Sequence, residues 1–268
     1  MCWHKPPPIV VNPANRRLLS FTINNYPGSI NDLNGCSNDG KQVKETLLNY
    51  WPDFDVKRFI DSEAKLSTFK AEVAAAINVL NPGATVLILP DSCFSGTVTR
   101  FMDLGLKADL HPTKNRFFQQ EDIPIRPRLK TGTFAARGDI KWIVISGCGE
   151  TEYSADAFIN GAYHGAFTYY AMKTLVPGIT YRQWHKEICK YLPGTKFEQS
   201  PTIEGPDYLL DKNVFDDESL VIHNSTHGTQ LIDYTGDPTR DEPIDEAICF
   251  YDGNLRDDDY FNLLTKIK

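Results

Sequence analysis

The sequence predicts an α/β protein whose core is a mostly parallel sheet covered by helices. Short apolar runs rich in valine, isoleucine and leucine have the length and composition of buried strands. Between them lie stretches in which apolar residues recur every three or four positions, which is the spacing of a helix face. Strands that alternate with helices assemble into a parallel sheet with helices on both faces. The 268 residues, 41% of them hydrophobic, suit one large α/β domain or two small ones.

Each element is expected from a local pattern. Residues 1–15 are rich in proline and asparagine and should form an irregular arm. The turn sequence 81–83, Asn-Pro-Gly, ends a helix directly before the most apolar strand. The expected strands are 18–23, 56–60, 84–90, 142–148, 221–223 and 247–250, with 201–205 as an edge strand. The expected helices are 43–51, 67–80, 167–175, 184–192 and 260–267.

Bulk properties narrow the class of function. The formal net charge is −7, which disfavours nucleic acid as a partner and favours cationic ligands. No segment approaches the roughly 20 apolar residues of a membrane span, and the N-terminus lacks the apolar core of a signal peptide. The six cysteines are scattered without paired spacing, so we expect reduced thiols. These features predict a cytoplasmic protein that binds neither nucleic acid nor a membrane.

The stretch 97–138 differs from the rest of the chain. It has few periodic apolar positions and eight lysine or arginine residues. One interpretation is a solvated, exposed surface loop, and the other is a linker that a protease cuts. A protease specific for basic residues would find several sites in it, among them Lys107, Lys114, Arg116, Arg126, Arg128 and Lys130.

A cysteine follows the most apolar strand. The run 84–90 leads directly into Asp91, Ser92 and Cys93. Ligands bind at the carboxyl ends of strands in open α/β sheets. An ordinary thiol is only a few per cent ionised at neutral pH, so Cys93 needs a base to act as a nucleophile. The alternative is a buried structural thiol, which is the usual fate of a cysteine.

A second apolar run, 219–222, leads to the histidine that would serve as that base. His227 follows this strand and precedes Gly228, whose backbone N–H is not shielded by a side chain. His223 lies four residues earlier and is expected to have a structural role. A cysteine and a histidine at two strand ends are the two halves of a cysteine hydrolase, while the alternative for His227 is a surface imidazole.

These motifs resemble those of the caspase and metacaspase cysteine peptidases. The STHG histidine motif differs from the family's SGHG only in that Thr226 replaces a glycine. The resemblance covers nearly all of residues 17–268. The blocks that carry it are LNGCSND at 33–39, the nucleophile motif DSCFSG at 91–96, ISGC at 145–148, SADA at 154–157, GAFT at 165–168 and STHG at 225–228.

The resemblance implies a single caspase-like domain over 1–268, with a six-stranded sheet and peptidase activity. Cys93 would attack the scissile carbonyl, His227 would transfer protons, and the amides of Cys93 and Gly228 would bind the oxyanion. No cofactor is needed for this chemistry. The substrates would be peptides or proteins, and we expect the enzyme to be a monomer.

The resemblance also implies a pocket that binds a basic side chain. Its members would be Cys36, Asp39, Asp91 and Ser225, with aspartates where aspartate-specific caspases have arginines. Two carboxylates with no obvious cation are costly to bury, and an arginine or lysine of the substrate would relieve that cost. We therefore expect cleavage after Arg or Lys. The alternative for Asp39 is a cap on the helix that begins nearby.

Calcium activation is a further implication of the resemblance. Asp257 and Asp258, with Asp241 and Asp245, would supply the oxygen ligands that calcium prefers. The alternative is that the acidic run 257–259 simply begins a helix, where the helix dipole favours negative charge.

The order of the blocks departs from that of metacaspases, because the histidine-bearing unit, 219–268, follows everything else. For His227 to reach Cys93, the strand 219–223 must lie parallel and adjacent to 84–90. The chain after Phe215 has three or four residues, which span roughly 10–14 Å, so Phe215 must end near the start of that strand. The reordering and the altered histidine motif leave a second hypothesis open, a caspase-like scaffold that binds partners and has lost activity.

Overall fold

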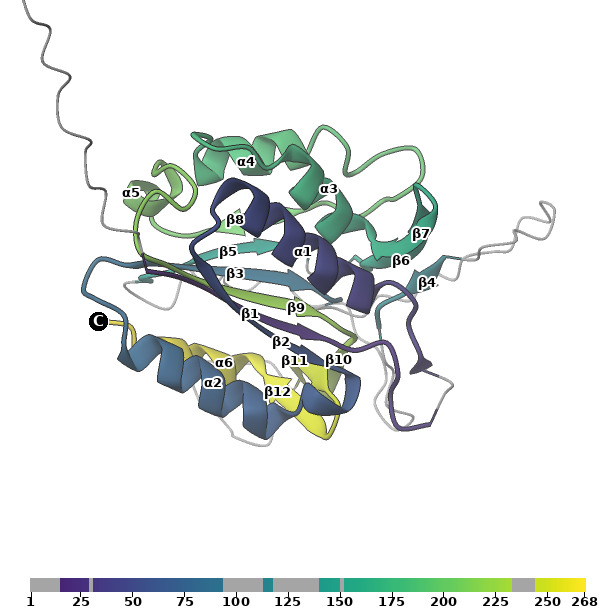
Figure 1. Ribbon diagram of the computed structural model, residues 1–268. Helices are drawn as coiled ribbons and strands as arrows, with labels where there is room; N and C mark the ends of the chain where they lie inside the picture. The colour runs from purple at the N-terminus through teal and green to yellow at the C-terminus, as the bar shows by residue number, and fades with distance from the viewer. Residues whose placement is uncertain (1–14, 29–30, 94–112, 118–139, 150–151, 233–243) are drawn as a thin grey trace, which may run out of the picture.

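A six-stranded sheet forms the middle layer of the protein (Figure 1). The computed structural model describes residues 15–28, 31–93, 113–117, 140–149, 152–232 and 244–268. The order of the strands is β2-β1-β9-β3-β5-β8, and all neighbours are parallel except β5 and β8. The strands are β1 (Arg16–Thr22), β2 (Phe54–Ile60), β3 (Thr85–Asp91), β5 (Ile143–Ser146), β8 (Thr202–Glu204) and β9 (Ser219–Ser225). The predicted α/β class, six-stranded, mostly parallel sheet and edge strand at 201–205 are confirmed, and the structure shows that this edge strand is antiparallel.

Helices cover both faces of this sheet, as the sequence predicted (Figure 1). One face carries α1 (Cys36–Tyr50), α3 (Ala166–Thr174), α4 (Tyr181–Ile188) and the short α5 (Asp207–Leu210). The other face carries α2 (Leu66–Asn78) and α6 (Asp257–Leu264). Side chains alternate along a strand, so the central strands supply both cores. In β3, for example, Leu87 and Leu89 pack in one core, while Val86 and Ile88 pack in the other.

Strand β9, the last strand of this sheet in the sequence, lies in its middle. It is adjacent to β3, as predicted from the requirement that His227 reach Cys93. It pairs in parallel with β1 on one side and with β3 on the other. The three strands end level, because Thr22, Ser225 and Asp91 share one register position. At the other end of the sheet, the carbonyl of Phe215 accepts a 2.7 Å hydrogen bond from Nε of Arg16, which lies opposite Ser219. Phe215 therefore lies near the start of β9, as the short connection between them required. The loops after Asp91 and Ser225 therefore leave from the same edge.

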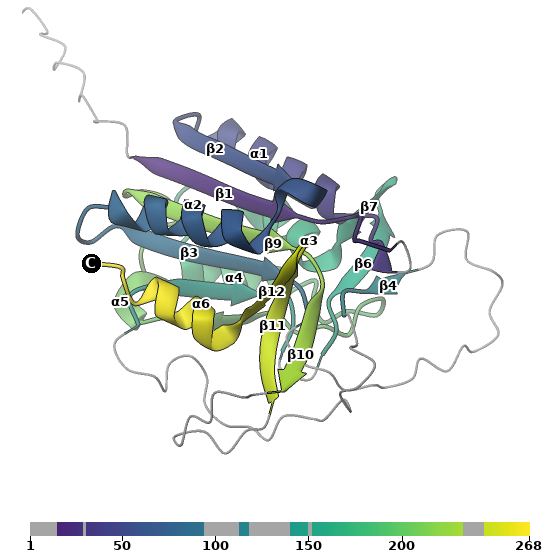
Figure 2. The same ribbon diagram turned by 90° about the horizontal axis from the view of Figure 1, so that it is seen from below.

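Two small antiparallel sheets flank that edge. One contains β10 (Gly228–Ile232), β11 (Ile244–Phe250) and β12 (Gly253–Arg256), and Figure 2 shows it crossing the direction of the main strands. The strand expected at 247–250 is therefore part of this separate sheet. The other contains β4 (Lys114–Asn115), β6 (Ala155–Ile159) and β7 (Ala162–Gly165). No helix in the described part of the chain is long and apolar enough to cross a membrane.

The stretch 97–138 is not simply an exposed loop. Within it the structure describes 113–117, and there the side chain of Arg116 is completely buried. The expectation of a solvated loop is wrong at this residue, because its guanidinium is surrounded by acidic side chains. The rest of the stretch and the expected arm at 1–14 lie outside the described residues.

Candidate active site

The two candidate catalytic loops meet at the carboxyl edge of the sheet. Cys93 follows β3 by two residues and is completely buried. Gly228 follows β9 by three residues, and it packs directly on the backbone of Cys93. A methyl group in place of its hydrogen would overlap the carbonyl of Cys93. The contact therefore requires glycine at this position.

The amides of these two residues converge on one oxygen atom. The N–H of Gly228 donates to the carbonyl oxygen of Arg116 at 2.9 Å, and the N–H of Cys93 donates to the same oxygen at 3.4 Å. Two backbone donors on one carbonyl form the arrangement that stabilises the oxyanion of acyl transfer. The sequence predicted these two amides for that role, and the structure places the carbonyl of the chain's own Arg116 between them.

The thiol of Cys93 contacts the backbone of Ser154. The backbone N–H of Ser154 donates to the sulfur at 2.9 Å, and the carbonyl oxygen of Ser154 lies 3.8 Å from it. That carbonyl also accepts a 3.0 Å hydrogen bond from the N–H of Arg116. The sulfur and the backbone of Arg116 are therefore held by one residue.

The imidazole of His227 is held in one orientation by a backbone carbonyl. Its Nε2 lies 2.7 Å from the carbonyl oxygen of Asn31. Because a carbonyl only accepts, Nε2 carries the proton and Nδ1 keeps its lone pair. Nδ1 is buried and has no hydrogen-bond partner among the described residues. Burial lowers the pKa of His227, although the carbonyls of Asn31 and Arg116 act in the opposite direction. A neutral imidazole with a free basic nitrogen results.

A tyrosine fixes the position of that imidazole. The hydroxyl of Tyr26 accepts a 2.9 Å hydrogen bond from the backbone N–H of His227. The two rings also pack against each other with their centroids 5.1 Å apart. His223, four residues earlier, lies instead in the interior, where its Nδ1 is 3.0 Å from the hydroxyl of Ser20. The two histidines thus have different surroundings, and His227 is the one at the edge with Cys93.

The side chain of Arg116, whose carbonyl accepts from Cys93 and Gly228, fills a pocket of three buried carboxylates. Its Nη2 lies 2.7 Å from Asp39 Oδ2 and 3.1 Å from Asp156 Oδ1. Its Nη1 donates to Ser225 Oγ at 2.7 Å and lies 3.4 Å from Asp91 Oδ2. The arginine and the three aspartates have no solvent-exposed side-chain surface. Both terminal nitrogens of the guanidinium therefore have charged or polar partners.

The carboxylates are held in place by donors other than the arginine. Asp39 accepts from the N–H of Gly165 at 3.0 Å, and Asp91 accepts from the hydroxyl of Thr168 at 2.6 Å. Further donors to these carboxylates are the backbone N–H of Asn34, Gly35 and Thr168 and the hydroxyls of Ser154 and Ser225. Hydrogen bonds of this kind keep buried carboxylates ionised and oriented. The pocket is thus rigidly defined on the protein side.

The electrostatics of the pocket favour a permanent cation. Burial raises the pKa of Asp39, and the positive charge of Arg116 opposes that shift. Burial alone would lower the pKa of Arg116, but its acidic neighbours outweigh this effect and raise it. The arginine therefore remains charged, and the expectation that these acids lack a cation is wrong because the chain provides one.

The other predicted pocket residues have these positions. Asp39 lies inside α1 and points into the pocket, whereas the residue that precedes the helix is Gly35, so the capping alternative is wrong. Cys36 is buried beside Ser225, and burial raises the pKa of its thiol, which keeps it neutral. Together with Asp91 and Ser225, these residues surround the guanidinium of Arg116, and their predicted role in binding a substrate side chain stays a prediction.

Several residues of the site were not predicted. Asp156 belongs to the SADA motif at 154–157, to which the sequence analysis assigned no role in the pocket. Tyr26, Asn31 and Ser154 act largely through backbone or hydroxyl groups, which leave no distinctive pattern in a sequence. The role of Arg116 could have been suspected only from the two acids that need a cation.

The proposed calcium ligands are not gathered in the described part of the chain. Asp257 and Asp258 lie in the first turn of α6, and Asp259 forms a 3.1 Å ion pair with Lys70. Within the described ranges, no group of three or more His, Cys, Asp or Glu side chains is arranged to hold a metal ion. Asp241 lies outside the described residues, so the complete set is untested and calcium binding stays a prediction.

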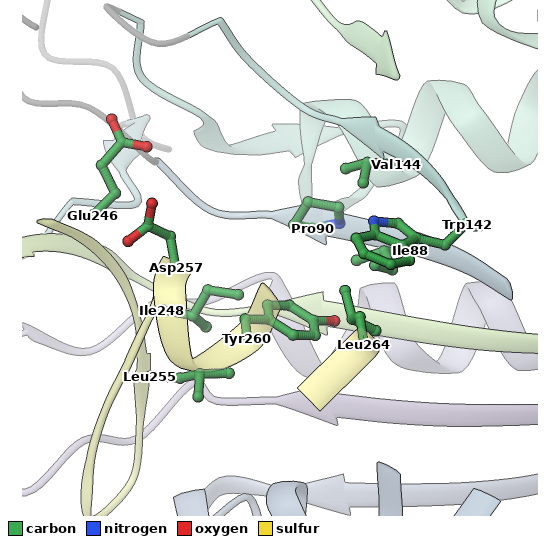
Figure 3. A pocket seen from close by; sticks show the side chains of 10 residues that line it. All are labelled: Ile88, Pro90, Trp142, Val144, Glu246, Ile248, Leu255, Asp257, Tyr260 and Leu264. Atoms are coloured by element: carbon green, nitrogen blue, oxygen red, sulfur yellow. The ribbon is translucent and has the colours of Figure 1, made fainter. Parts of the chain in front are cut away.

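A mostly apolar pocket, separate from the one that Arg116 fills, lies between the sheet and α6 (Figure 3). Its lining is mostly apolar, and Figure 3 shows the carboxylates of Glu246 and Asp257 at one end. The lining residues are Ile88, Pro90, Trp142, Val144, Glu246, Ile248, Leu255, Asp257, Tyr260 and Leu264. This pocket is separate from the edge at which Cys93 and His227 lie, because neither residue lines it.

Comparisons with known proteins give a fold and no family. No family model matches the chain, and no curated protein is significantly similar to it. Among solved structures, protein GSU0716 from Geobacter sulfurreducens matches with a TM-score of 0.53 and 17% sequence identity. The match covers 75% of this chain and 98% of that one. At this identity the likeness concerns the fold alone.

Proposed function

We propose that the protein is a cysteine endopeptidase of the caspase and metacaspase type, which hydrolyses peptide bonds after arginine. One observation carries this proposal. Arg116 lies with its side chain among three carboxylates and with its carbonyl on the amides of Cys93 and Gly228. An arginine of a substrate held in this way would have its carbonyl beside the thiol.

The residues of the site have complementary roles in this reaction. His227 Nδ1 takes the proton of the thiol, and Cys93 then attacks the carbonyl carbon. The amides of Cys93 and Gly228 stabilise the oxyanion that forms, an effect worth about 10²–10³ in kcat for a single donor. His227 gives its proton to the leaving amine, and water releases the acyl group from the sulfur. The hydrogen bond to Asn31 holds the imidazole in the required tautomer.

The pocket favours arginine over lysine. Both terminal nitrogens of the guanidinium have partners on different elements: Asp39 on α1, Asp156 on β6, and Asp91 and Ser225 at strand ends. A lysine ammonium is a compact charge that cannot reach both sets of partners at once. Cleavage after lysine, which the resemblance also implies, is therefore expected to be slower.

The test is hydrolysis of a short peptide with arginine before a fluorescent leaving group. The Cys93→Ala variant should lose all activity, because it lacks the thiol that forms the acyl intermediate. Cys189→Ala is a matched control, since Cys189 is exposed and lies on the far end of α4, and it should leave the rate unchanged. Full turnover by folded Cys93→Ala protein, or preference for aspartate over arginine, would contradict the proposal.

The occupied pocket also favours a second candidate. A scaffold that has lost activity could keep Arg116 in place permanently as a structural ion pair, and Thr226 in the histidine motif agrees with such a loss. A thiol-reactive peptide probe that ends in arginine separates the two candidates. Labelling of Cys93 supports the peptidase, and its absence in folded protein supports the scaffold.

A reducing compartment is part of the same proposal. The catalytic thiol must stay reduced, and among the described residues Cys36, Cys93, Cys189 and Cys249 form no disulfide. A cytoplasmic location and a monomeric peptidase acting on peptides or proteins follow as predictions.

A further inference from the structure

We infer that Asp61 is a positioning residue of the candidate active site. Its carboxylate holds the loop formed by residues 24–34, and this loop in turn holds the imidazole of His227. Among the described residues, the hydrogen bonds of this carboxylate all go to the loop, so its effect on catalysis passes through the loop. The inference rests on the proposed function, because it gives Asp61 a part in the proton transfer that His227 performs.

Asp61 stands at the same edge of the sheet as the candidate active site. It is the first residue after β2, whose last residue, Ile60, shares a register position with Thr22 of β1. Thr22 is in turn level with Ser225, the last residue of β9. The segments that follow these three neighbouring strands therefore leave the sheet next to one another.

The backbone of Asp61 has a conformation that most side chains avoid. Its φ is 50°, which lies in the left-handed region. Apart from glycine, aspartate and asparagine are among the residues that occur there most readily. A residue keeps such a conformation only when its surroundings compensate for the strain, and residues of this kind cluster at functional sites. The compensation at Asp61 comes from its carboxylate.

That carboxylate binds three donors of the loop. Oδ1 of Asp61 accepts from the backbone N–H of Asn24 at 2.7 Å and from that of Asn25 at 3.0 Å. Oδ2 accepts from the side-chain amide of Asn25 at 2.6 Å. Hydrogen bonds to an ionised acceptor are roughly twice as strong as those between neutral groups. Asp61 therefore fixes the path of the chain directly before Tyr26.

The loop is closed by its own hydrogen bonds. The carbonyl of Asn24 accepts from the N–H of Leu33 at 2.8 Å, and the N–H of Tyr26 donates to Oδ1 of Asp32 at 2.9 Å. The side-chain amide of Asn24 also donates to the carbonyl of Asn34 at 3.3 Å. Because these bonds join the two limbs of the loop, a shift of one limb moves the other.

Each limb makes one contact with His227. The first limb provides the hydroxyl of Tyr26, which accepts from the backbone N–H of His227 at 2.9 Å. The second limb provides the carbonyl of Asn31, which lies 2.7 Å from Nε2 of the ring. Burial raises the pKa of Tyr26, so its hydroxyl stays protonated and also donates to the carbonyl of Cys249 at 3.4 Å. The backbone and the ring of His227 are thus both held by the loop that Asp61 anchors.

A displaced loop would release the tautomer and the direction of this ring. With the Asn31 carbonyl on Nε2, the lone pair stays on Nδ1, the nitrogen that takes the proton of Cys93. A misplacement of about 1 Å in a catalytic arrangement can cost about 100-fold in rate. The arginine of the substrate is bound elsewhere, in the pocket around Asp39. We therefore expect Asp61 to affect kcat much more than KM.

The first test reads the tautomer of His227 and needs no catalysis. The protein is labelled with nitrogen-15 at histidine, and the signals of His227 are assigned by their loss in His227→Gln. Wild type should show a protonated Nε2 and an unprotonated Nδ1 at neutral pH. In Asp61→Gly the two nitrogen shifts should move toward each other, because the ring exchanges between tautomers. Glycine accepts a φ of 50° without strain, so this variant keeps the fold while it loses the carboxylate.

A matched control makes the same backbone change elsewhere. Asn160, in the exposed turn between β6 and β7, has a φ of 52°. Asn160→Gly should leave the tautomer of His227 and the hydrolysis of the arginine reporter as they are in wild type. An equal loss in this control would mean that added chain flexibility, and not the missing carboxylate, causes the effect.

The second test is the kinetics of the arginine reporter. Asp61→Gly should lower kcat by about 10- to 100-fold and leave KM nearly unchanged. Asp61→Asn should recover much of this loss, because asparagine tolerates the same φ and keeps one oxygen for the two backbone N–H groups. A rise in KM with kcat unchanged would overturn the inference, since it would place the role of Asp61 in substrate binding.

A double-mutant cycle tests whether the effect passes through the loop. Tyr26→Phe removes the hydroxyl that binds the N–H of His227 and should also lower kcat. Combined with Asp61→Gly, it should cost much less than the product of the two single effects, because both changes release the same contact. Two fully independent effects would overturn the proposed path.

The outcomes separate the inference from the proposed function. A fixed tautomer and an unchanged kcat in folded Asp61→Gly would overturn the inference and leave the peptidase intact. Absence of reporter hydrolysis in wild type would overturn the proposed function. In that case a tautomer that becomes mixed in Asp61→Gly would still support the hold of Asp61 on His227, and a tautomer that stays fixed would overturn it.

Discussion

Two groups of three aspartates have different surroundings in the structure. Asp39, Asp91 and Asp156 come from three distant elements and meet in the interior around one guanidinium. Asp257 to Asp259 are consecutive and begin α6, where Asp259 faces Lys70 with both side chains about half exposed. Both regions were candidates for binding a cation. The comparison shows that burial and fixed donors, more than the number of acids, make such a site.

The physical reason lies in solvation. A carboxylate at the surface is stabilised by water and gains little from a partner, typically less than about 1 kcal/mol. A buried carboxylate has lost that water, so it depends on its protein donors and on the cation. The helix start, in addition, is a favourable place for acids without any ligand, because the helix dipole is positive there. Each of the following predictions tests this difference.

The largest effect is expected at the buried acid. Asp39→Asn keeps the shape of the side chain and removes the charge that faces Arg116 Nη2 at 2.7 Å. Truncation of a buried charged partner costs about 2–5 kcal/mol, so kcat/KM for the arginine reporter should fall by roughly 30-fold or more. Asp259→Asn makes the same chemical change at the surface and should leave kcat/KM unaltered. Equal effects of the two variants would refute the comparison.

A smaller effect concerns acid stability at the buried region. His223 is 3.5 Å from Thr168, whose hydroxyl binds Asp91, and burial lowers the pKa of His223 to about 3. In the unfolded chain this pKa returns to about 6.5. The unfolded state therefore binds the proton first, so stability is complete above pH 6.5 and is lost as the pH falls toward 3.

The measurement is urea unfolding of wild type and His223→Gln at pH 7.5 and pH 5. Over this interval the imidazole should cost wild type about 2 kcal/mol of unfolding free energy. The variant is expected to be less stable at pH 7.5 but to lose about 2 kcal/mol less on acidification. Parallel pH dependences of the two proteins would show that His223 is not responsible.

If calcium binds at Asp257 and Asp258, these acids at the start of α6 would also have a cation as partner, as the buried acids do. Calcium binding predicts that protein stripped with a chelator regains activity when calcium is added, by several-fold at least. The double variant Asp257→Asn/Asp258→Asn should not respond. A wild-type protein whose activity ignores both chelator and calcium would remove this prediction and leave the acidic run as the start of α6.

The smallest effect is expected at the surface ion pair. Lys70 and Asp259 are 3.1 Å apart and partly exposed, so Asp259→Asn should change the free energy of unfolding by less than about 1 kcal/mol. Added salt should reduce even that difference, because exposed charges are screened. A larger loss that persists at high salt would mean that this region is not a simple solvated helix start.

Much of the fold could be predicted because it depends on local patterns. Runs such as 84–90 and 219–222 are continuous and apolar, which is typical of strands buried on both faces. Even the position of β9 followed from the requirement that His227 reach Cys93. The hairpin of β6 and β7 escaped prediction, because its strands are short and partly polar.

The candidate site was predictable only in part, for a related reason. Motif positions pointed to Cys93, Gly228 and Asp39, and the structure brings them together. Asp156, the third acid, lies on β6, and Arg116, which fills the pocket, follows β4. The positions of both depend on the pairing of β6 with β4 and β7, strands that are distant in sequence or short. No local spacing encodes such a meeting, since Arg116 is 25 residues from Asp91, 40 from Asp156 and 77 from Asp39.

The central position of β9 has a consequence for how the chain is made. The five other strands of the main sheet precede it in the sequence. Translation proceeds at about 5–20 residues per second, so β1 and β3 would leave the ribosome with a gap between them that only residues 219–225 can fill. During that interval two open strand edges are exposed to pairing with other chains. The same delay keeps the Cys93 thiol and the His227 imidazole apart, so the candidate active site can form only after β9 has been synthesised.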